Sequence, residues 1–254
     1  MPLPIIPTIA ILSALPEEQH GLIDLLKQPL KVTHAGRDFW QGNLYGQPVV
    51  LALTKIGKVA AATTATGLIE RFGVGYMVFT GVAGGLGAGV QVGDVVVATN
   101  FIQHDMDASP LFARYEVPLY GKTSFNADVR LTALLFKAAE TALVSGYESQ
   151  IFAGAKVHQG LIASGDRFVS SAQEANGLRI ALAGAGHAVL AVEMEGAAVA
   201  QVCHDYGIAF AAVRTISDRA DDSAHVDFPS FVHQVASQYA LEIMKCFLNL
   251  LSIR

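Results

Sequence analysis

Three apolar stretches of the sequence lead directly into acidic side chains. The stretches and the acids that follow them are Ile9–Ala14 with Glu17 and Glu18, Val189–Val192 with Glu193 and Glu195, and Phe210–Ile216 with Asp218. Short apolar runs are typical of buried strands, where a carboxylate is costly unless something uses it. Ligands of open α/β sheets bind at the carboxyl ends of the strands. The pattern therefore predicts an active site built from carboxylates at one edge of a sheet.

The acids Glu17 and Glu18 have two interpretations. Pro16 favours the start of a helix, because the first helical residue needs no partner for its N–H. Acids in a first helical turn also interact favourably with the helix dipole on an ordinary surface. On the residues alone, a functional role and a surface role both stay open.

A glycine-rich segment, Thr80–Gly87, follows the apolar run Tyr76–Phe79. Glycine lets the backbone approach a ligand closely, so the segment is a candidate binding loop, with a tight turn as the alternative. Its spacing matches neither G-x-G-x-x-G nor G-x-x-x-x-G-K-S/T. The sequence therefore predicts neither a dinucleotide cofactor nor a P-loop.

His104, Asp105 and Asp107 belong to the residue types that bind metal ions. Neighbouring side chains on an extended segment point to opposite faces, however, so this spacing does not bring them onto one ion. We therefore expect no metal site and no cofactor.

The composition indicates a folded enzyme that acts on a small molecule. Of 254 residues, 52 % are hydrophobic and 15 % are charged, which excludes disorder and suits one substantial core. No apolar run reaches the ~18 residues of a membrane span, and the start of the chain lacks the basic region of a signal peptide. Two cysteines suggest no disulfide framework, and a net charge of -5 argues against nucleic acid as a partner. We expect a cytoplasmic protein, without a membrane partner, whose residues 1–7 form a flexible extension.

Apolar periodicity predicts alternating strands and helices. The predicted strands are Thr8–Ala14, a β meander over Lys31–Leu53, Tyr76–Phe79, Val92–Ala98, a strand pair over Ile151–Ser164, Val189–Val192 and Ile208–Ile216. The predicted helices begin at Pro16 and Ala197 or span Val59–Phe72, Asn126–Ser145, Ser170–Ala183 and Ser230–Leu250, the last capped by Asp227 and Pro229. Ala108–Phe125 is expected to be a long loop, such as a lid or a partner contact, and Ser217–Asp222 a polar loop. The fold class is therefore α/β: a single three-layer α/β/α domain over residues 1–254, with a central mixed, twisted β-sheet.

Several short motifs occur in the order of one known family. They are Ala14–Glu18, Lys55–Ala61, Thr80–Leu86, Val92–Asp94, Ser164–Asp166, Val192–Glu195 and Arg214–Asp218. In these motifs the chain resembles the 5′-methylthioadenosine/S-adenosylhomocysteine nucleosidases of the nucleoside phosphorylase superfamily, over nearly all of its length. The resemblance implies hydrolysis of the N-glycosidic bond of these nucleosides, with 5′-deoxyadenosine as a further candidate substrate, to adenine and a 5-substituted ribose.

The resemblance also implies catalytic roles. The bond breaks through an oxocarbenium-like ribose, and adenine leaves poorly until its N7 is protonated. Asp218 matches the general acid at N7, oriented by Ser217, and its pKa must be raised by a dry pocket. Glu18 matches the residue that positions and deprotonates the attacking water, with Arg214 nearby. Glu195 matches the acceptor for the ribose 2′ and 3′ hydroxyls, and its charge favours the cationic ribose.

Further contacts with the substrate follow from the same resemblance. Met194 packs under the sugar, Phe168 stacks on adenine, and the backbone of Val169 reads the adenine edge. Ile56 and Phe228 line the pocket for the 5′-alkylthio group. The remaining substrate-binding positions are Glu193, Ala83 and Gly84.

The resemblance implies a homodimer as well, in which the partner subunit completes the tail pocket. Two positions depart from the family pattern. Val82 stands where these nucleosidases often carry a hydroxyl residue, which predicts the loss of a polar contact near the water or the ribose. Ala108–Phe125 matches poorly, although the partner's share of the tail pocket usually comes from this segment.

Three related readings compete with the nucleosidase. A purine nucleoside phosphorylase of the same superfamily needs cations around a phosphate, but Pro16-Glu17-Glu18 replaces the usual Gly-x-x-x-Arg element. A futalosine-type hydrolase shares the water chemistry and differs in base and 5′ group. A non-catalytic nucleoside-binding protein should have lost one of the acids Glu18, Glu195 or Asp218, and all are present.

Overall fold

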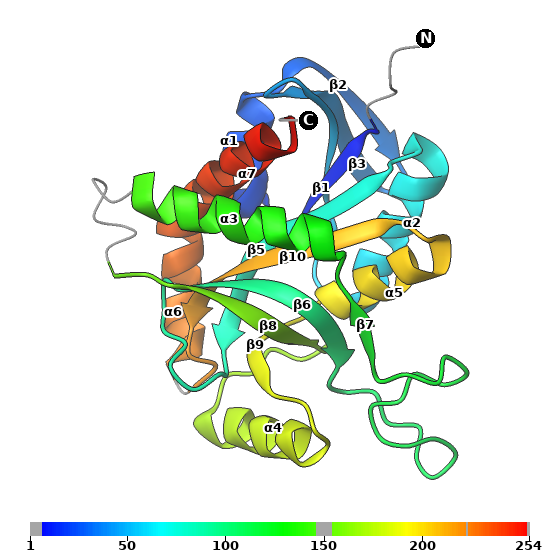
Figure 1. The fold of residues 1–254 in the computed structure, drawn as a ribbon, viewed down its shortest axis with the longest axis vertical. Helices are drawn as coiled ribbons and strands as arrows, with labels where there is room; N and C mark the ends of the chain where they lie inside the picture. Colours follow the sequence, from blue (N-terminus) through cyan, green and yellow to red (C-terminus); the bar gives the residue numbers. More distant parts are fainter. Residues whose placement is uncertain (1–6, 146–153, 222, 253–254) are drawn as a thin grey trace.

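Short runs of Val, Ile, Leu and Ala form a mixed β-sheet at the centre of the computed structural model, which describes residues 7–145, 154–221 and 223–252 (Figure 1). Its strands are β1 (Ile9–Ser13), β2 (Lys27–His34), β3 (Arg37–Leu44), β4 (Gln47–Leu53), β5 (Tyr76–Gly85), β6 (Val95–Gln103), β7 (Ser124–Asn126), β8 (Val157–Ser164), β9 (Val189–Glu193) and β10 (Ala209–Asp218). They lie in the order β10-β6-β8-β9-β5-β1-β4-β3-β2, with β7 beside β6. The antiparallel strands β2, β3 and β4 are the predicted meander.

Part of the sheet closes into a ring. β5 pairs in parallel with β10 and meets the end of β9, while β10, β6, β8 and β9 pair in succession. The closure places Gly84 of β5 beside both Val192 of β9 and Asp218 of β10. Because β1 also runs parallel to β5, the carboxyl ends of β1, β5, β9 and β10 converge. The predicted meeting of the acid-bearing strand ends is thus confirmed.

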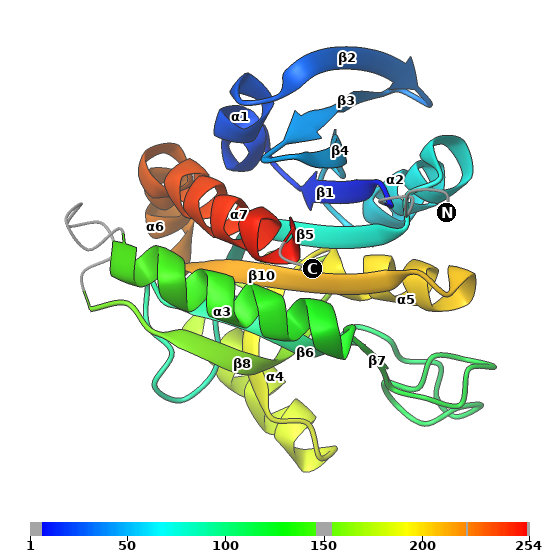
Figure 2. The ribbon, with the colours of Figure 1, turned by 45° about the horizontal axis from the view of Figure 1, so that its top comes forward.

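Helices cover both faces of this sheet (Figures 1 and 2). On one face pack α1 (Pro16–Asp24), α3 (Val129–Ser145) and α7 (Ser237–Ser252), and on the other α2 (Lys58–Phe72) and α5 (Gly196–Tyr206). The strand β9 also contacts α4 (Ala172–Gly184), and α6 (Ala224–Phe231) continues through a π turn at Val232–Ala236 into α7. The expected three layers and mixed sheet are therefore confirmed.

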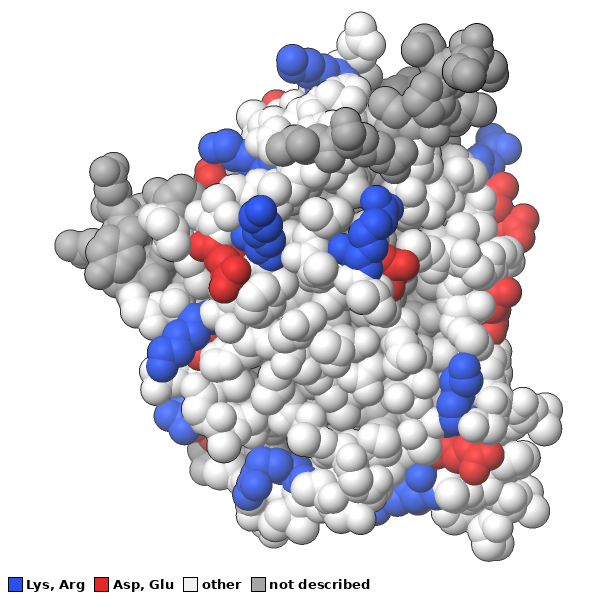
Figure 3. All heavy atoms as spheres, viewed as in Figure 1, with Lys and Arg blue, Asp and Glu red and all other residues white. Residues whose placement is uncertain are grey.

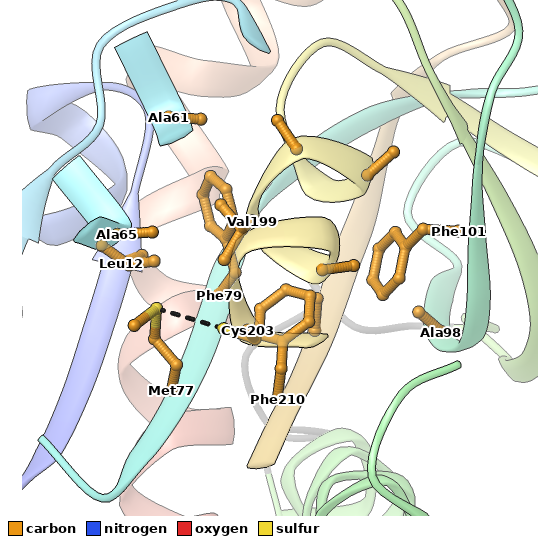
Figure 4. Close-up of a cluster of buried hydrophobic side chains, with 14 of the residues drawn as sticks. Leu12, Ala61, Ala65, Met77, Phe79, Ala98, Phe101, Val199, Cys203 and Phe210 are labelled. Atoms are coloured by element: carbon orange, nitrogen blue, oxygen red, sulfur yellow. Dashed lines mark hydrogen bonds between the residues drawn. The ribbon is translucent and has the colours of Figure 1, made fainter. Parts of the chain in front are cut away.

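Small residues let α2 and α5 pack closely on the sheet (Figure 4). Ala61 and Ala65 of α2 are fully buried in the cluster that holds Phe79 and Phe101. The thiol of Cys203 on α5 lies 3.7 Å from the sulfur of Met77. The alanines of α2 thus serve packing within the chain.

The surface carries few charged side chains, as the low content of charged residues predicts. Figure 3 shows Lys and Arg scattered among Asp and Glu on one face, without a broad patch of either sign. Within the described ranges, no helix is both long and apolar enough to cross a lipid bilayer.

Two strands are longer than the periodicity predicts. The glycine-rich residues Thr80–Gly85 continue β5 instead of forming a loop, and Ser217 and Asp218 belong to β10 instead of a polar loop. The pairing of β10 with β5 extends to Asp218 and Gly84, so each strand holds the other extended. By contrast, the strand predicted from Val92 begins at Val95, because residues 92–94 form a turn in which Asp94 accepts a hydrogen bond from the N–H of Gln91.

Two other predicted elements differ in the structure. Within residues 154–164 of the predicted strand pair, β8 is the strand that forms, while residues 151–153 of that prediction lie outside the described part, as do residues 1–6 of the expected extension. The last helical segment begins at Ala224, so Asp227 lies in its first turn and Pro229 lies inside it. The hydroxyl of Ser223 donates 2.5 Å to Asp227 and so supports this earlier start.

Candidate active site

A cavity of about 320 Å³ lies where the ends of β1, β5, β9 and β10 converge. It is lined by Ala14, Leu15, Glu18, Ile56, Val82, Ala83, Gly84, Phe168, Val192, Glu193, Met194, Glu195, Ser217, Asp218 and Phe228. The structure thus brings together every predicted site residue except Arg214 and Val169. Arg214 is buried behind Glu193, a residue of the cavity wall, to which it donates a hydrogen bond. Val169 belongs to a neighbouring apolar cluster.

Glu18 is held from the first turn of α1 by backbone N–H groups. Its Oε2 accepts from the N–H of Ala14 at 2.8 Å and of Leu15 at 2.9 Å, and its Oε1 from the N–H of Val82 at 3.0 Å. A Cβ on Gly81 would lie 2.8 Å from Oε1, so this approach requires glycine. Burial raises the pKa of Glu18, although these N–H groups and the charge of Arg214 oppose the shift. Glu18 is therefore a buried group of fixed orientation and not a surface acid.

Glu193 and Arg214 form a buried ion pair, with Nη2 of the arginine 2.7 Å from Oε2 of the glutamate. The carboxylate also accepts from the hydroxyl of Ser164 and from the N–H groups of Glu195 and Gly196. These contacts are all within the chain, so they favour a positioning role for Glu193 over direct binding.

Arg214 also stacks over an aromatic ring. Its guanidinium lies 4.0 Å from the ring centre of Phe79, a cation–π contact that holds the planar group in place. From this position its charge opposes the upward pKa shifts that burial causes in Glu18 and Glu195. The arginine therefore acts on the cavity through its electrostatic field.

Glu195 faces the cavity with a single described hydrogen bond to its carboxylate, from the N–H of Gly57 to Oε1 at 2.9 Å. Burial, and then the neighbouring charge of Glu193, raise the pKa of Glu195 to about 8. The N–H of Gly57 and the charge of Arg214 oppose this shift. A ligand that donates hydrogen bonds or carries positive charge would stabilise the ionised carboxylate.

Asp218 ends β10 as a nearly fully buried acid. Its Oδ2 accepts from the hydroxyl of Ser217 at 2.8 Å and its Oδ1 from the N–H of Ala220 at 2.8 Å. Burial raises the pKa of Asp218, while both of these hydrogen bonds oppose the shift. Ala220, which donates to Oδ1, has a φ of 51°, an uncommon backbone conformation for a residue with a side chain. The two hydrogen bonds fix the orientation of the Asp218 carboxyl.

The remaining walls are apolar. Phe168 and Phe228 meet edge to face, with ring centres 5.5 Å apart. Ile56 is 57 % exposed at the rim of the cavity, and Met194 also lines the wall. The site thus combines flat aromatic and aliphatic surface with buried carboxyls, which suits a nucleoside-sized ligand.

Backbone groups are the part of the site that sequence reasoning missed. The N–H groups of Ala14, Leu15, Val82, Gly57 and Ala220 hold the three acids, and any residue type except proline could supply them. Val82 contributes its N–H here, so the absence of a hydroxyl side chain does not remove this contact. Two glycines in the sequence mark these close contacts: a side chain at Gly81 would crowd the carboxylate of Glu18, and one at Gly57 would crowd that of Asp166.

The candidate metal motif has other partners. Asp105 accepts 2.6 Å from the ammonium of Lys58, and Asp107 accepts from the N–H of Ser109. Across residues 7–145, 154–221 and 223–252, no group of at least three His, Cys, Asp or Glu side chains is arranged to hold a metal ion.

Comparison with known proteins places the chain in a family. The family model described as "Phosphorylase superfamily" matches residues 8–251. A 5′-methylthioadenosine/S-adenosylhomocysteine nucleosidase from Bacillus thuringiensis (strain Al Hakam) is 37 % identical over 228 residues, which cover 90 % of this chain and 93 % of the relative. The corresponding nucleosidase from Bacillus cereus (strain AH187) has the same identity and coverage.

Solved structures agree with the sequence matches. The nucleosidase of this name from Neisseria meningitidis, in complex with methylthio-immucillin-A, has a TM-score of 0.84 and 35 % identity over 96 % of this chain and 99 % of its own. The S-adenosylhomocysteine nucleosidase from Streptococcus pyogenes, in complex with 5-methylthiotubericidin, has a TM-score of 0.85 and 29 % identity over 97 % of this chain and 98 % of its own. The chain therefore belongs to the phosphorylase superfamily and, within it, to the family of the 5′-methylthioadenosine/S-adenosylhomocysteine nucleosidases.

Proposed function

We propose that this protein hydrolyses the N-glycosidic bond of 5′-methylthioadenosine and S-adenosylhomocysteine, and releases adenine and the 5-substituted ribose. The observation that carries the proposal is the placement of three buried acids, Glu18, Glu195 and Asp218, around one cavity with apolar walls. Each acid has a different set of hydrogen-bond partners, so each is suited to a different task.

Asp218 is the general acid. An ordinary aspartate is almost fully ionised at neutral pH, but burial shifts the pKa of Asp218 upward and so favours the protonated form that N7 of adenine needs. The hydroxyl of Ser217 and the N–H of Ala220 fix the orientation of the carboxyl. Proton transfer to N7 turns adenine into a good leaving group as the ribose becomes cationic.

Glu18 activates the water. Its carboxylate is anchored by three backbone N–H groups, and Arg214 supports its ionised form through the interior. A carboxylate held in this way can orient a water molecule toward the anomeric carbon and accept its proton. The buried surroundings strengthen the interaction of this charge with the developing positive charge.

Glu195 binds the sugar. Its second carboxylate oxygen, Oε2, accepts no hydrogen bond from the described residues and is available to the ribose 2′ and 3′ hydroxyls, while the charge of the carboxylate stabilises the cationic ribose. Met194 packs under the sugar, Phe168 stacks on adenine, and Ile56 and Phe228 line the pocket for the 5′ group. The apolar surface of Ile56 and Phe228 supports a thioether tail over a free 5′ hydroxyl.

Water is favoured over phosphate by the charges around the cavity. Its described lining residues include three glutamates and one aspartate but neither lysine nor arginine. The buried Arg214 is already paired with Glu193. A phosphate ion would therefore meet repulsion from the acids without a cation to offset it, which disfavours a phosphorylase.

A homodimer is the second part of the proposal. Large apolar side chains on α2 and on the segment between β6 and β7 are strongly exposed: Val59 by 78 %, Leu111 by 85 % and Leu119 by 92 %. The segment that carries Leu111 and Leu119 projects from the body beside β7 (Figure 1). Exposed apolar side chains of this size fit a subunit contact. Sedimentation of the wild type and of Val59→Glu tests this, since the charge should shift a dimer toward monomer.

One assay tests the proposed reaction. The purified protein is incubated with methylthioadenosine, with and without phosphate and after dialysis against a chelator, and free adenine is measured. We expect equal adenine release in all three conditions. A requirement for phosphate would favour the phosphorylase, a requirement for metal would contradict the mechanism, and no cleavage would favour a futalosine-type hydrolase or a binding protein. The cytoplasmic location stays a prediction, which cell fractionation tests.

A further inference from the structure

Asp105 lies outside the residues that line the cavity, yet its carboxylate joins two segments of the rim. Its Oδ1 accepts from the ammonium of Lys58 at 2.6 Å, and its Oδ2 from the N–H of Asp166 at 2.9 Å. The ammonium of Lys58 also donates to the side chain of Gln103 at 3.1 Å. Both carboxylate oxygens of Asp105 are therefore used within the chain.

The two segments meet again at the N-terminus of α2. The N–H of Lys58 donates to Oδ1 of Asp166 at 2.7 Å, so the carboxylate of Asp166 caps this helix. Gly57, the preceding residue, has no side chain to do so, and its φ of 97° favours glycine. A Cβ on Gly57 would also lie 3.1 Å from the capping oxygen. Lys58 is thus held at its backbone by Asp166 and at its side chain by Asp105.

The turn at Gly57 and Lys58 is hydrogen-bonded to Glu195. The N–H of Gly57 donates to Oε1 of Glu195 at 2.9 Å and is the only described donor to that carboxylate. The position of the Gly57–Lys58 turn therefore helps to set where this carboxylate points. Asp105 holds the turn through the ammonium of Lys58 and, by accepting from the N–H of Asp166, also supports the carboxylate that caps the N–H of Lys58.

We propose that Asp105 is a positioning residue for the ribose clamp, which holds the Gly57–Lys58 turn so that the N–H of Gly57 orients Glu195. The inference rests on the proposed function, because it takes Glu195 as the residue that accepts the ribose hydroxyls. As an isolated surface ion pair, Asp105 and Lys58 would contribute little to stability. Their effect lies in geometry, since small displacements of a binding group reduce catalysis strongly.

The test replaces Asp105 with Asn, which keeps the shape but offers only one acceptor where two donors point. We expect kcat/KM for methylthioadenosine to fall about 10- to 100-fold. Asp38→Asn is the matched control, because Asp38 of β3 accepts from Lys31 of β2 at 2.7 Å in an exposed ion pair. It should stay within about twofold of the wild type. Lys58→Met breaks the same contact from the other end and should reproduce the loss.

A double-mutant cycle separates positioning from general destabilisation. Binding of methylthio-immucillin-A is measured by calorimetry for the wild type, Asp105→Asn, Glu195→Gln and the double variant. We expect the effect of Asp105→Asn to fall below about twofold once Glu195 is replaced, because the two residues act through one contact. Wild-type kinetics for Asp105→Asn, or losses that multiply in the double variant, would overturn the proposal. A wild-type protein that releases no adenine would instead refute the proposed function.

Discussion

Replacing Asp218 with Asn tests the proposed acid most directly, because the structure accommodates the amide. The Asn carbonyl can still accept from the N–H of Ala220, at the 2.8 Å now seen for Oδ1. The amide nitrogen would face the hydroxyl of Ser217, which can accept that hydrogen bond and turn its own hydrogen to the carbonyl of Ala83, 3.4 Å away. The fold should therefore survive, but the side chain has no proton to transfer.

The size of the loss follows from the role. Removing a positioned general acid costs about 10²–10⁴-fold in rate, or about 3 to 5 kcal/mol in the barrier. We expect Asp218→Asn to lose this much in the release of adenine from methylthioadenosine, while it still binds adenine in a calorimetric titration. A nitrophenyl thioriboside has a leaving group that needs no protonation, so its cleavage should be spared most of the loss. Equal losses on both substrates would refute the reasoning and reduce Asp218 to a binding or structural group.

Three further predictions concern the other walls of the site. Glu18→Gln should lose about 10²–10⁴-fold in kcat yet bind methylthioadenosine in calorimetry, and wild-type turnover would remove Glu18 from the mechanism. Phe228→Ala should weaken the binding of methylthioadenosine by about 1–3 kcal/mol through lost apolar contact, and an equal effect on the binding of adenosine would place Phe228 outside the tail pocket. The raised pKa of Glu195 makes its burial increasingly unfavourable as pH rises from 4.5 through about 8. Glu195→Gln should therefore gain stability relative to the wild type over that range in thermal melts, and a pH-independent difference would contradict the shift.

The sequence predicted the strand ends and their acids because local patterns specify both. Val189–Val192 and Phe210–Ile216 are buried strands that deliver Glu195 and Asp218 to one cavity. The residue roles came from the family resemblance and stay predictions until the variants are measured. What local patterns specify poorly is the length of a strand whose last residues depend on a distant partner. The stretch Thr80–Gly85 has the composition of a loop but is held extended by β10.

The hydrogen bonds from backbone N–H groups to the acids could not be predicted from the sequence for a different reason. The N–H of Val82 that holds Glu18 is 64 residues away in the chain, and the N–H of Gly57 that holds Glu195 is 138 residues away. Such contacts depend on where two segments lie in space, and no side-chain pattern encodes them. Pro229 misled for a local reason: with Asp227 it has the pattern of a cap before a helix at Ser230, whereas the helical structure begins at Ala224 and contains Pro229.

The closed ring of strands also has a consequence for folding. Its last seams join β5 to β9 and β10, so Gly84 must find Val192 and Asp218 more than a hundred residues further along the chain. Closing loops of that length is entropically costly and slow compared with forming helices or hairpins. During synthesis on the ribosome, Glu18 is therefore present long before Glu195, the residue that binds the ribose, and Asp218, the general acid. Recovery of activity during refolding should follow the closure of this seam and lag behind the recovery of helical signal.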